Sequence, residues 1–162
     1  MQLSTYIRTG LTLFAAALAL VPAANAGSQT TTLSQNERAL LTAVNDVRAS
    51  HGLRALRVDA TLVRAARSYS AHMIRTGTFT HGAMGARLAR AGARGPVYGE
   101  NLAWGVGASA GARTIVRSWM ASPGHRANML RRGWTRIGLG ALRGSFQGYS
   151  GATVVTADFA GS

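Results

Sequence analysis

The chain contains no cysteine, and only five of its 162 residues are acidic. Without cysteine the protein can form no disulfide, no thiolate metal site and no cysteine nucleophile. Five carboxylates leave few ways to build the paired acids of a glycosidase or a calcium loop with several acidic ligands. Hydrophobic residues make up 47% of the chain, enough for a core, and the length predicts one domain.

Lysine is absent as well, so all 18 basic residues are arginine and the formal net charge is +13. Such a charge attracts anionic surfaces, whether nucleic acid, teichoic acid or lipid head groups. The arginines are spread along the chain and no nucleic-acid-binding motif accompanies them, so a nucleic acid partner is not expected. Two interpretations stay open: the codon bias of a high-GC genome, or a surface selected to bind the cell envelope.

Residues 1–26 have the pattern of a bacterial secretory signal peptide. Arg8 precedes an apolar run over residues 11–21, and Ala24-Asn25-Ala26 resembles a cleavage box. The apolar run is about half of the ~20 residues that a membrane-spanning helix needs. We therefore expect cleavage after Ala26 and a secreted or periplasmic protein with no membrane span after cleavage.

The rest of the chain divides into a flexible leader, residues 27–33, and one domain, residues 34–162. Apolar spacing and capping residues predict helices from Ser34 to Gly52 and from Asp59 to Gly77, with further helices at 83–91, around Ile115–Met120 and at 122–130. Residues 135–142 and 152–159 are predicted strands joined by a Gly/Ser loop. Helices followed by a hairpin favour an α+β fold in which helices pack on an antiparallel sheet.

Two of the four histidines lie where they could carry chemistry. His81 is in a turn after a predicted helix, and His125 is in the first turn of a short helix, where the positive helix end favours neutral imidazole. Neutral imidazole is the form that binds metal. His51, at a helix end, and His72, within a helix, are interpreted as structural or surface residues.

Glu100 is the acidic residue with the most unusual neighbours. It lies between Gly99 and Asn101 within a glycine-rich stretch, residues 92–107. A carboxylate placed beside glycine suggests that the backbone there must adopt a demanding geometry. Asn101 and Asn128 are expected to bond backbone groups, and the three tryptophans are expected to pack in the core.

The ordered motifs of the chain resemble the CAP superfamily of cysteine-rich secretory, antigen 5 and pathogenesis-related proteins, in particular its bacterial SCP-like extracellular branch. The likeness covers residues 34–161. The matching motifs, in chain order, are Leu41-x-x-x-Asn45-x-x-Arg48, His51-Gly52-Leu53, Phe79-Thr80-His81, Gly99-Glu100-Asn101-Leu102-Ala103-Trp104, Trp119, Ser122-Pro123-Gly124-His125-Arg126-Ala127-Asn128-Met129-Leu130, Ile137-Gly138-Leu139-Gly140 and Thr156-x-x-Phe159.

The resemblance implies an α–β–α sandwich with a central antiparallel sheet, and a cleft of two histidines and two acids that holds zinc in some members. His81, Glu100 and His125 match three of these four positions. At the fourth, three residues after Trp119, this chain has Ser122 instead of an acid, and Ser122 is expected to cap the next helix. Asp158 is a candidate for the missing carboxylate.

Four functions remain open at this point. The first is a binding module whose cleft takes a divalent ion, Zn²⁺, through His81, His125 and Glu100. The second is a zinc-dependent hydrolase with Glu100 as general base, the one catalytic candidate. The third is a protein that binds a small molecule, a lipid or the envelope. The fourth is a purely structural polar cluster. A monomer is expected in each case.

Overall fold

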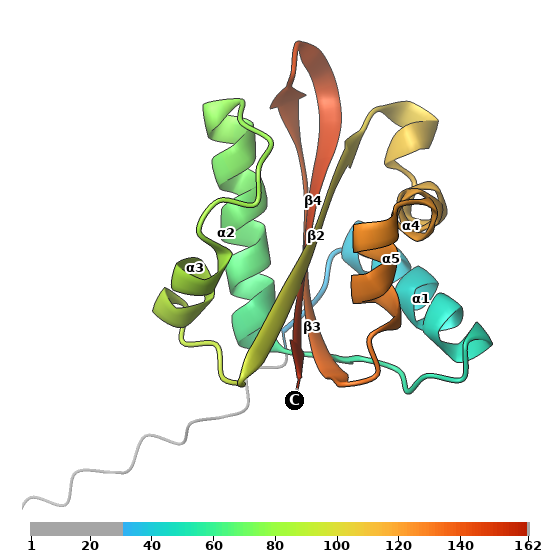
Figure 1. Cartoon of the computed structure of the whole chain (residues 1–162). Helices are drawn as coiled ribbons and strands as arrows, with labels where there is room; N and C mark the ends of the chain where they lie inside the picture. The colour runs from blue at the N-terminus through green and yellow to red at the C-terminus, as the bar shows by residue number, and fades with distance from the viewer. Residues whose placement is uncertain (1–30, 162) are drawn as a thin grey trace, which may run out of the picture.

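The computed structural model describes residues 31–161, which form three layers with a β-sheet between two sets of helices (Figure 1). Helices α2 and α3 cover one face of the sheet, and α1, α4 and α5 cover the other. The elements in chain order are α1 (Gln35–Ser50), β1 (Arg57–Val58), α2 (Ala60–Thr76), α3 (Met84–Arg90), β2 (Val97–Gly105), the short 3₁₀ helix η1 (Gly107–Ala110), α4 (Ala112–Ala121), α5 (Pro123–Leu130), β3 (Trp134–Phe146) and β4 (Tyr149–Gly161). The predicted α+β sandwich is confirmed.

The predicted signal peptide, residues 1–26, lies outside the described residues, as do residues 27–30 of the predicted leader. Among the residues that the structure does describe, no helix has the length and apolarity to cross a membrane.

The two longest helices begin and end where local chemistry predicts. At the start of α1 the Glu37 amide donates to Ser34 Oγ at 3.3 Å, and the Ser34 amide donates to Glu37 Oε2 at 2.8 Å. Asp59 Oδ1 accepts from the amides of Thr61 and Leu62 and so caps α2. Gly77 ends α2 in a left-handed conformation, with φ 67°. Both predicted helices are therefore confirmed within a residue or two.

The sheet has the strand order β1-β3-β4-β2 and is antiparallel except for the two-residue parallel pair between β1 and β3. The predicted strands 135–142 and 152–159 lie inside β3 and β4, which are longer at both ends. The predicted Gly/Ser loop between them was wrong in extent, because only Gln147 and Gly148 form the turn, with φ 50° and 82°. A two-residue turn of this kind continues the right-handed twist of a hairpin.

Strand β2 was not anticipated, because its sequence lies in a glycine-rich stretch that is typical of a loop. It pairs with β4 over its whole length and forms one edge of the sheet. At Gly99 the reason for glycine is close packing: a Cβ would lie 2.8 Å from Trp134 Cζ2 and 3.0 Å from Asn128 Oδ1. The special backbone expected beside Glu100 is therefore a close approach of neighbouring elements.

The two faces of β3 pack in different ways. Ile137 and Leu139 join the main core cluster, which contains residues of α1 and α4 and the buried Trp119. Gly138 and Gly140 alternate with them and meet α2, where a Cβ on Gly138 would lie 2.1 Å from the Leu62 carbonyl carbon. The backbone of α2 thus lies directly on the sheet, and this contact fixes the position of the loop that follows α2.

Buried Arg48 fixes the end of α5 against α1. It is 0% exposed, and its Nη1 donates to the carbonyls of Met129 at 2.9 Å and Arg131 at 3.1 Å. Trp119 and Trp134 are each 1% exposed, as expected for packing residues. Helix α5, which carries His125, is therefore held at its end by hydrogen bonds from a buried cation.

Candidate functional site

His81, Glu100 and His125 all line one cleft at the β2 edge of the sheet. The cleft has a volume of about 560 Å³. Its lining residues are His81, Gly82, Met84, Gly99, Glu100, Ser122, Gly124, His125 and Asn128. His81 comes from the loop between α2 and α3, whereas His125 comes from α5 on the opposite side of the sheet. The cleft therefore joins the two helical layers around an edge strand.

Glu100 orients His81. His81 Nδ1 lies 2.8 Å from Glu100 Oε1, and the side chain of Glu100 is only 1% exposed, against 56% for His81. A carboxylate in this position accepts a hydrogen bond from Nδ1–H, which leaves Nε2 with its lone pair free for a ligand. While Glu100 is ionised, this bond defines the tautomer of the neutral imidazole and leaves Nε2 available.

Behind Glu100 lies a second acid, Asp158, and one arginine between the two. Glu100 and Asp158 are register partners on β2 and β4. Arg87, from α3, donates from Nη2 to Glu100 Oε2 and from Nη1 to Asp158 Oδ2 at 3.0 Å. Asp158 does not line the cleft, so it does not replace the missing fourth residue; it shares the counter-ion of Glu100 instead.

Burial raises the pKa of both acids, because a carboxylate loses its hydration inside the protein. The charge of Arg87 opposes this effect, but a single guanidinium cannot balance two buried carboxylates. The pKa of Glu100 and that of Asp158 are each raised to about 7. The pair therefore takes up a proton close to neutral pH.

His125 remains neutral near pH 7. Burial lowers its pKa, and the nearby His81 lowers it further. The sequence-based expectation of a neutral His125 holds, with burial as the main cause. Ser122 occupies the N-cap position of α5, but its side chain makes no capping hydrogen bond. The predicted N-cap position of Ser122 is therefore confirmed without the side-chain capping bond, and Ser122 also lines the cleft.

Two side-chain amides, from the buried Asn101 and the half-buried Asn128, hold α5 against β2. Asn101 Nδ2 donates to the His125 carbonyl at 3.1 Å, and Asn128 Nδ2 donates to the Glu100 carbonyl at 3.0 Å. These bonds confirm that the two asparagines bond backbone groups. They also set the position of His125 relative to Glu100, because each bond joins the two segments that carry these residues.

The donor set fits a metal only in part. Within residues 31–161 no group of three or more His, Asp or Glu side chains is arranged to hold a metal ion. Both oxygens of Glu100 have partners, His81 on one side and Arg87 on the other. The two imidazoles remain as direct donors, with Glu100 as the group that orients one of them.

Sequence reasoning missed Arg87. Nothing in its neighbourhood on the chain distinguishes it from the other 17 arginines. One signal existed: any buried carboxylate needs a cation or a proton, and a chain with five acids and a buried Glu100 must supply one or the other. That signal does not say which arginine is the partner.

The fold is shared with proteins of a known family. Residues 41–159 match the family model "CAP: Cysteine-rich secretory protein family". The chain belongs to the CAP family. A relative from Bacillus subtilis (strain 168), "Uncharacterized protein YkwD", is 32% identical over 118 residues, which is 70% of this chain and 45% of the relative. The chain thus spans less than half the length of that relative.

Solved structures of bacterial proteins share the fold of this CAP domain. An extracellular protein containing a SCP domain from Bacillus anthracis str. Ames matches with a TM-score of 0.63 and 23% identity over 82% of this chain and 45% of that one. An outer surface protein from Borrelia burgdorferi matches with a TM-score of 0.66 and 20% identity over 82% of this chain and 97% of that one. At such identities the likeness establishes the fold and leaves the ligand to be argued from the cleft.

Proposed function

We propose that this CAP domain is a secreted binding module whose cleft takes a divalent cation through His81 and His125, with zinc the best fit. The observation that supports this proposal is the meeting of both imidazoles in one cleft, with Glu100 2.8 Å behind His81. Imidazole nitrogen is a preferred zinc donor, and a carboxylate behind a ligating histidine raises its basicity.

Each residue has a separate role in this proposal. Nε2 of His81 and the neutral ring of His125 are the direct donors, Glu100 fixes the tautomer of His81, and Ser122 forms part of the wall. Two protein donors leave the remaining positions of a tetrahedral ion to water or to a carboxylate of the bound ligand. We therefore expect weak to moderate metal affinity and a ligand that contributes its own donor atom.

Binding accounts for the geometry better than hydrolysis. A general base needs a carboxylate oxygen that can reach a water molecule. Glu100 Oε1 is engaged by His81, and Oε2 is engaged by the half-buried Arg87. The raised pKa of Glu100 also favours its protonated form as the pH falls below 7. We therefore assign Glu100 an orienting role.

Zinc calorimetry near neutral pH tests the cleft. The purified protein is expected to bind one Zn²⁺, and His81→Ala/His125→Ala is expected to lose that site. Glu100→Gln is expected to weaken binding by about tenfold, the scale of groups that orient metal ligands. His51→Ala is the matched control, because His51 is exposed at the end of α1 and does not line the cleft. No uptake by the unmodified protein, or equal uptake by the double variant, contradicts the proposal.

Secretion is a separate part of the proposal. It is supported by the pattern of residues 1–26 and by the extracellular and outer-surface descriptions of two structural relatives. Mass spectrometry of the exported protein is expected to find Gly27 at the amino terminus. An intact chain beginning at Met1 and retained in the cell contradicts it.

Size-exclusion chromatography of the same sample tests the predicted monomer.

A further inference from the structure

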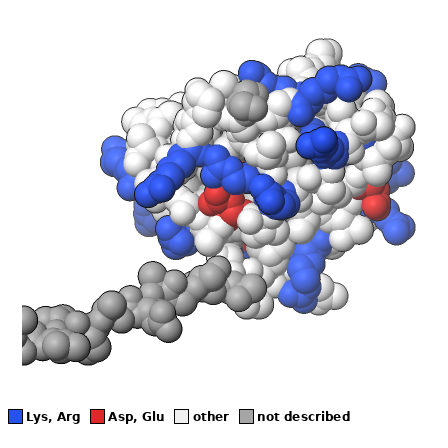
Figure 2. Space-filling view, turned by 90° about the horizontal axis from the view of Figure 1, so that it is seen from below, with Lys and Arg blue, Asp and Glu red and all other residues white. Residues whose placement is uncertain are grey.

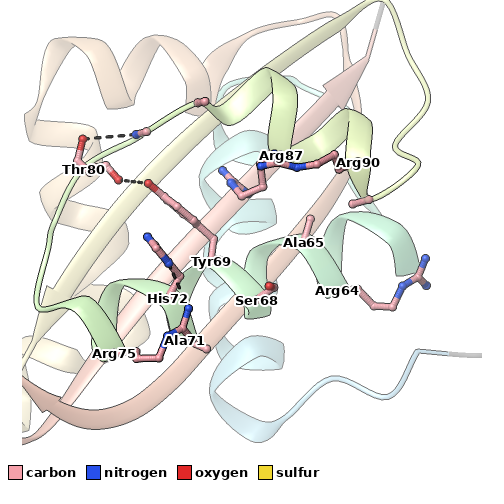
Figure 3. Close-up of a pocket in the computed structure, with 13 residues that line it drawn as sticks. Arg64, Ala65, Ser68, Tyr69, Ala71, His72, Arg75, Thr80, Arg87 and Arg90 are labelled. Carbon is pink, nitrogen blue, oxygen red and sulfur yellow. Dashed lines mark hydrogen bonds between the residues drawn. The ribbon is translucent and has the colours of Figure 1, made fainter.

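A second cavity, of about 670 Å³, lies between α2 and α3 (Figure 3). It has Gly82 in common with the cleft and otherwise a different lining. One wall is a stripe along α2, and the other is α3 with the loop before it. The stripe consists of Arg64, Ser68, Ala71, His72 and Arg75, and α3 contributes Arg87 and Arg90. We call this cavity the α2/α3 groove.

The positive charge of the α2/α3 groove is compensated only at Arg87 among the arginines that line it. All five acids of the chain lie within residues 31–161, and none of them lines the groove. Arg87 is paired with Glu100 and Asp158, but the exposed Arg64, Arg75 and Arg90 form no salt bridge with any described residue. Arginines are also scattered over the face of the molecule seen in Figure 2. In the groove, however, they border a cavity.

The spacing of the arginines selects an extended anion. Arg64 and Arg75 are eleven positions apart on one face of α2, so their Cα atoms are separated by about 16 Å along the helix. Arg90 lies on the opposite wall. A single small anion cannot contact both ends of such a groove. A chain that carries several negative groups can, because each guanidinium then meets a different group.

The side chains that line the groove between the arginines are mostly small and apolar. Ala65, Ala71, Ala83 and Ala91 lie in the lining. The aromatic ring of Tyr69 is covered by the Arg87 guanidinium at 4.0 Å from the ring centre. The Tyr69 hydroxyl donates to the Thr80 carbonyl at 2.5 Å, as Figure 3 shows. The Tyr69 ring contacts both Arg87 and His72, so it is not free to stack with a nucleic acid base, whereas short aliphatic linkers between anionic groups fit against alanine.

We infer that the α2/α3 groove binds a linear polyanion whose negative groups are phosphates joined by short non-aromatic linkers. Guanidinium groups bind phosphate oxygens in pairs of parallel hydrogen bonds, which gives them selectivity for this anion. The inference is independent of the metal proposed for the cleft, since the arginines Arg64, Arg75 and Arg90 do not line the cleft.

Calorimetry with linear inorganic polyphosphate as the probe tests the groove. The full protein is expected to bind long polyphosphate more tightly than tripolyphosphate, and orthophosphate least. Arg64→Gln/Arg75→Gln is expected to lose about tenfold or more in affinity for the long chain and to reduce the salt dependence, because two phosphate contacts are removed.

The matched control is Arg113→Gln/Arg117→Gln on α4. These two arginines are exposed and lie across the sheet from the groove, and Arg117 bonds Thr114 three residues before it as Arg64 bonds Thr61. The control removes the same charge and is expected to lose less than about threefold, the part due to general attraction. Thermal unfolding of each variant checks that the fold is unchanged.

Three outcomes overturn the inference. Equal loss of affinity in both double variants means that the attraction is diffuse. Equally tight binding of polyglutamate means that phosphate is not selected. Binding to phosphatidylglycerol vesicles without binding to polyphosphate assigns the groove to a membrane surface instead.

His81→Ala/His125→Ala is expected to keep its polyphosphate binding. Failure of the cleft proposal and failure of the groove inference can therefore be distinguished.

Discussion

Two buried clusters in this protein pair arginine with carboxylate, and they differ in charge balance. Glu37, 1% exposed, receives two hydrogen bonds from Arg67, at 2.8 and 2.5 Å, so one acid faces one arginine. Burial raises the pKa of Glu37, but the bonds from Arg67 and Ser34 outweigh burial, and the pKa is below its ordinary value. This cluster is a fixed, balanced link between α1 and α2.

The second cluster places Arg87 against two acids, Glu100 and Asp158, and both of their pKa values are raised. It also lies between the two cavities, because Arg87 lines the α2/α3 groove and Glu100 lines the cleft. Burial raises the pKa of the acids in both clusters, and the clusters differ in what offsets it: Glu37 has Arg67 and Ser34 to itself, whereas Glu100 and Asp158 share Arg87.

The largest expected effect comes from removing the shared cation. Arg87→Ala leaves two buried acids without their shared cation and is expected to cost about 3–5 kcal/mol of unfolding free energy at pH 8. The loss shrinks at pH 5, because both carboxyls are then protonated. Urea unfolding at the two pH values measures this, with Arg90→Ala, one turn further along α3, as the control. An equal loss at both pH values means that Arg87 acts mainly by packing on Tyr69.

The balanced cluster is expected to respond to acid only at a lower pH, because the pKa of Glu37 lies below its ordinary value. Glu37→Gln removes charge-assisted hydrogen bonds and is expected to cost about 2 kcal/mol at pH 7. The folded pKa of Glu37 is below the unfolded value of 4.5, so its contribution is present above that value and lost as the pH falls through the folded pKa. Denaturant unfolding at neutral and at acidic pH should show the cost of the variant shrinking in acid. Asp46→Asn, an exposed acid on the same helix, should change little at either pH.

Asp158→Asn converts the unbalanced cluster into a balanced one. In the unmodified protein the two folded pKa values, about 7, exceed the ordinary 4.5 and 3.8, so the contribution of the pair is full below those ordinary values and is lost as the pH rises through 7. The variant is expected to reduce this loss between pH 5 and 8 by an amount on the order of 1 kcal/mol. An unchanged slope of unfolding free energy against pH would show that the two acids do not share a proton.

Ser122→Asp is expected to have the smallest effect on stability and a local effect on the cleft. Aspartate is a good N-cap residue, so α5 should begin as before. The added carboxylate lies in the lining of the cleft and is expected to tighten zinc binding by about tenfold, the scale of a single supporting group. Calorimetry beside Ser122→Asn, which lacks the charge, measures the gain. Equal affinity in both variants would place the metal away from Ser122.

The sequence predicted the helices well because their signals are local. Ser34 and Glu37 cap α1 from three residues apart, and Asp59 caps α2 through amides two and three residues away. Strand β2 was missed because its identity depends on β4, which follows only after α4, α5 and β3 along the chain. The three candidate site residues were found through their motifs, and the structure places them in one cleft.

Residue order and chemistry were sufficient for the helix ends, the α+β class, the family and the trio His81, Glu100 and His125. Three features appear only in the folded structure. Arg87 bonds both Glu100 and Asp158, Ser122 lies in the cleft without a capping bond, and Arg64 and Arg75 on α2 face α3 across a groove. The physical reason is one of range. Capping and periodicity act within a few residues, whereas the pairing of a buried charge depends on which segments the sheet and helices bring together.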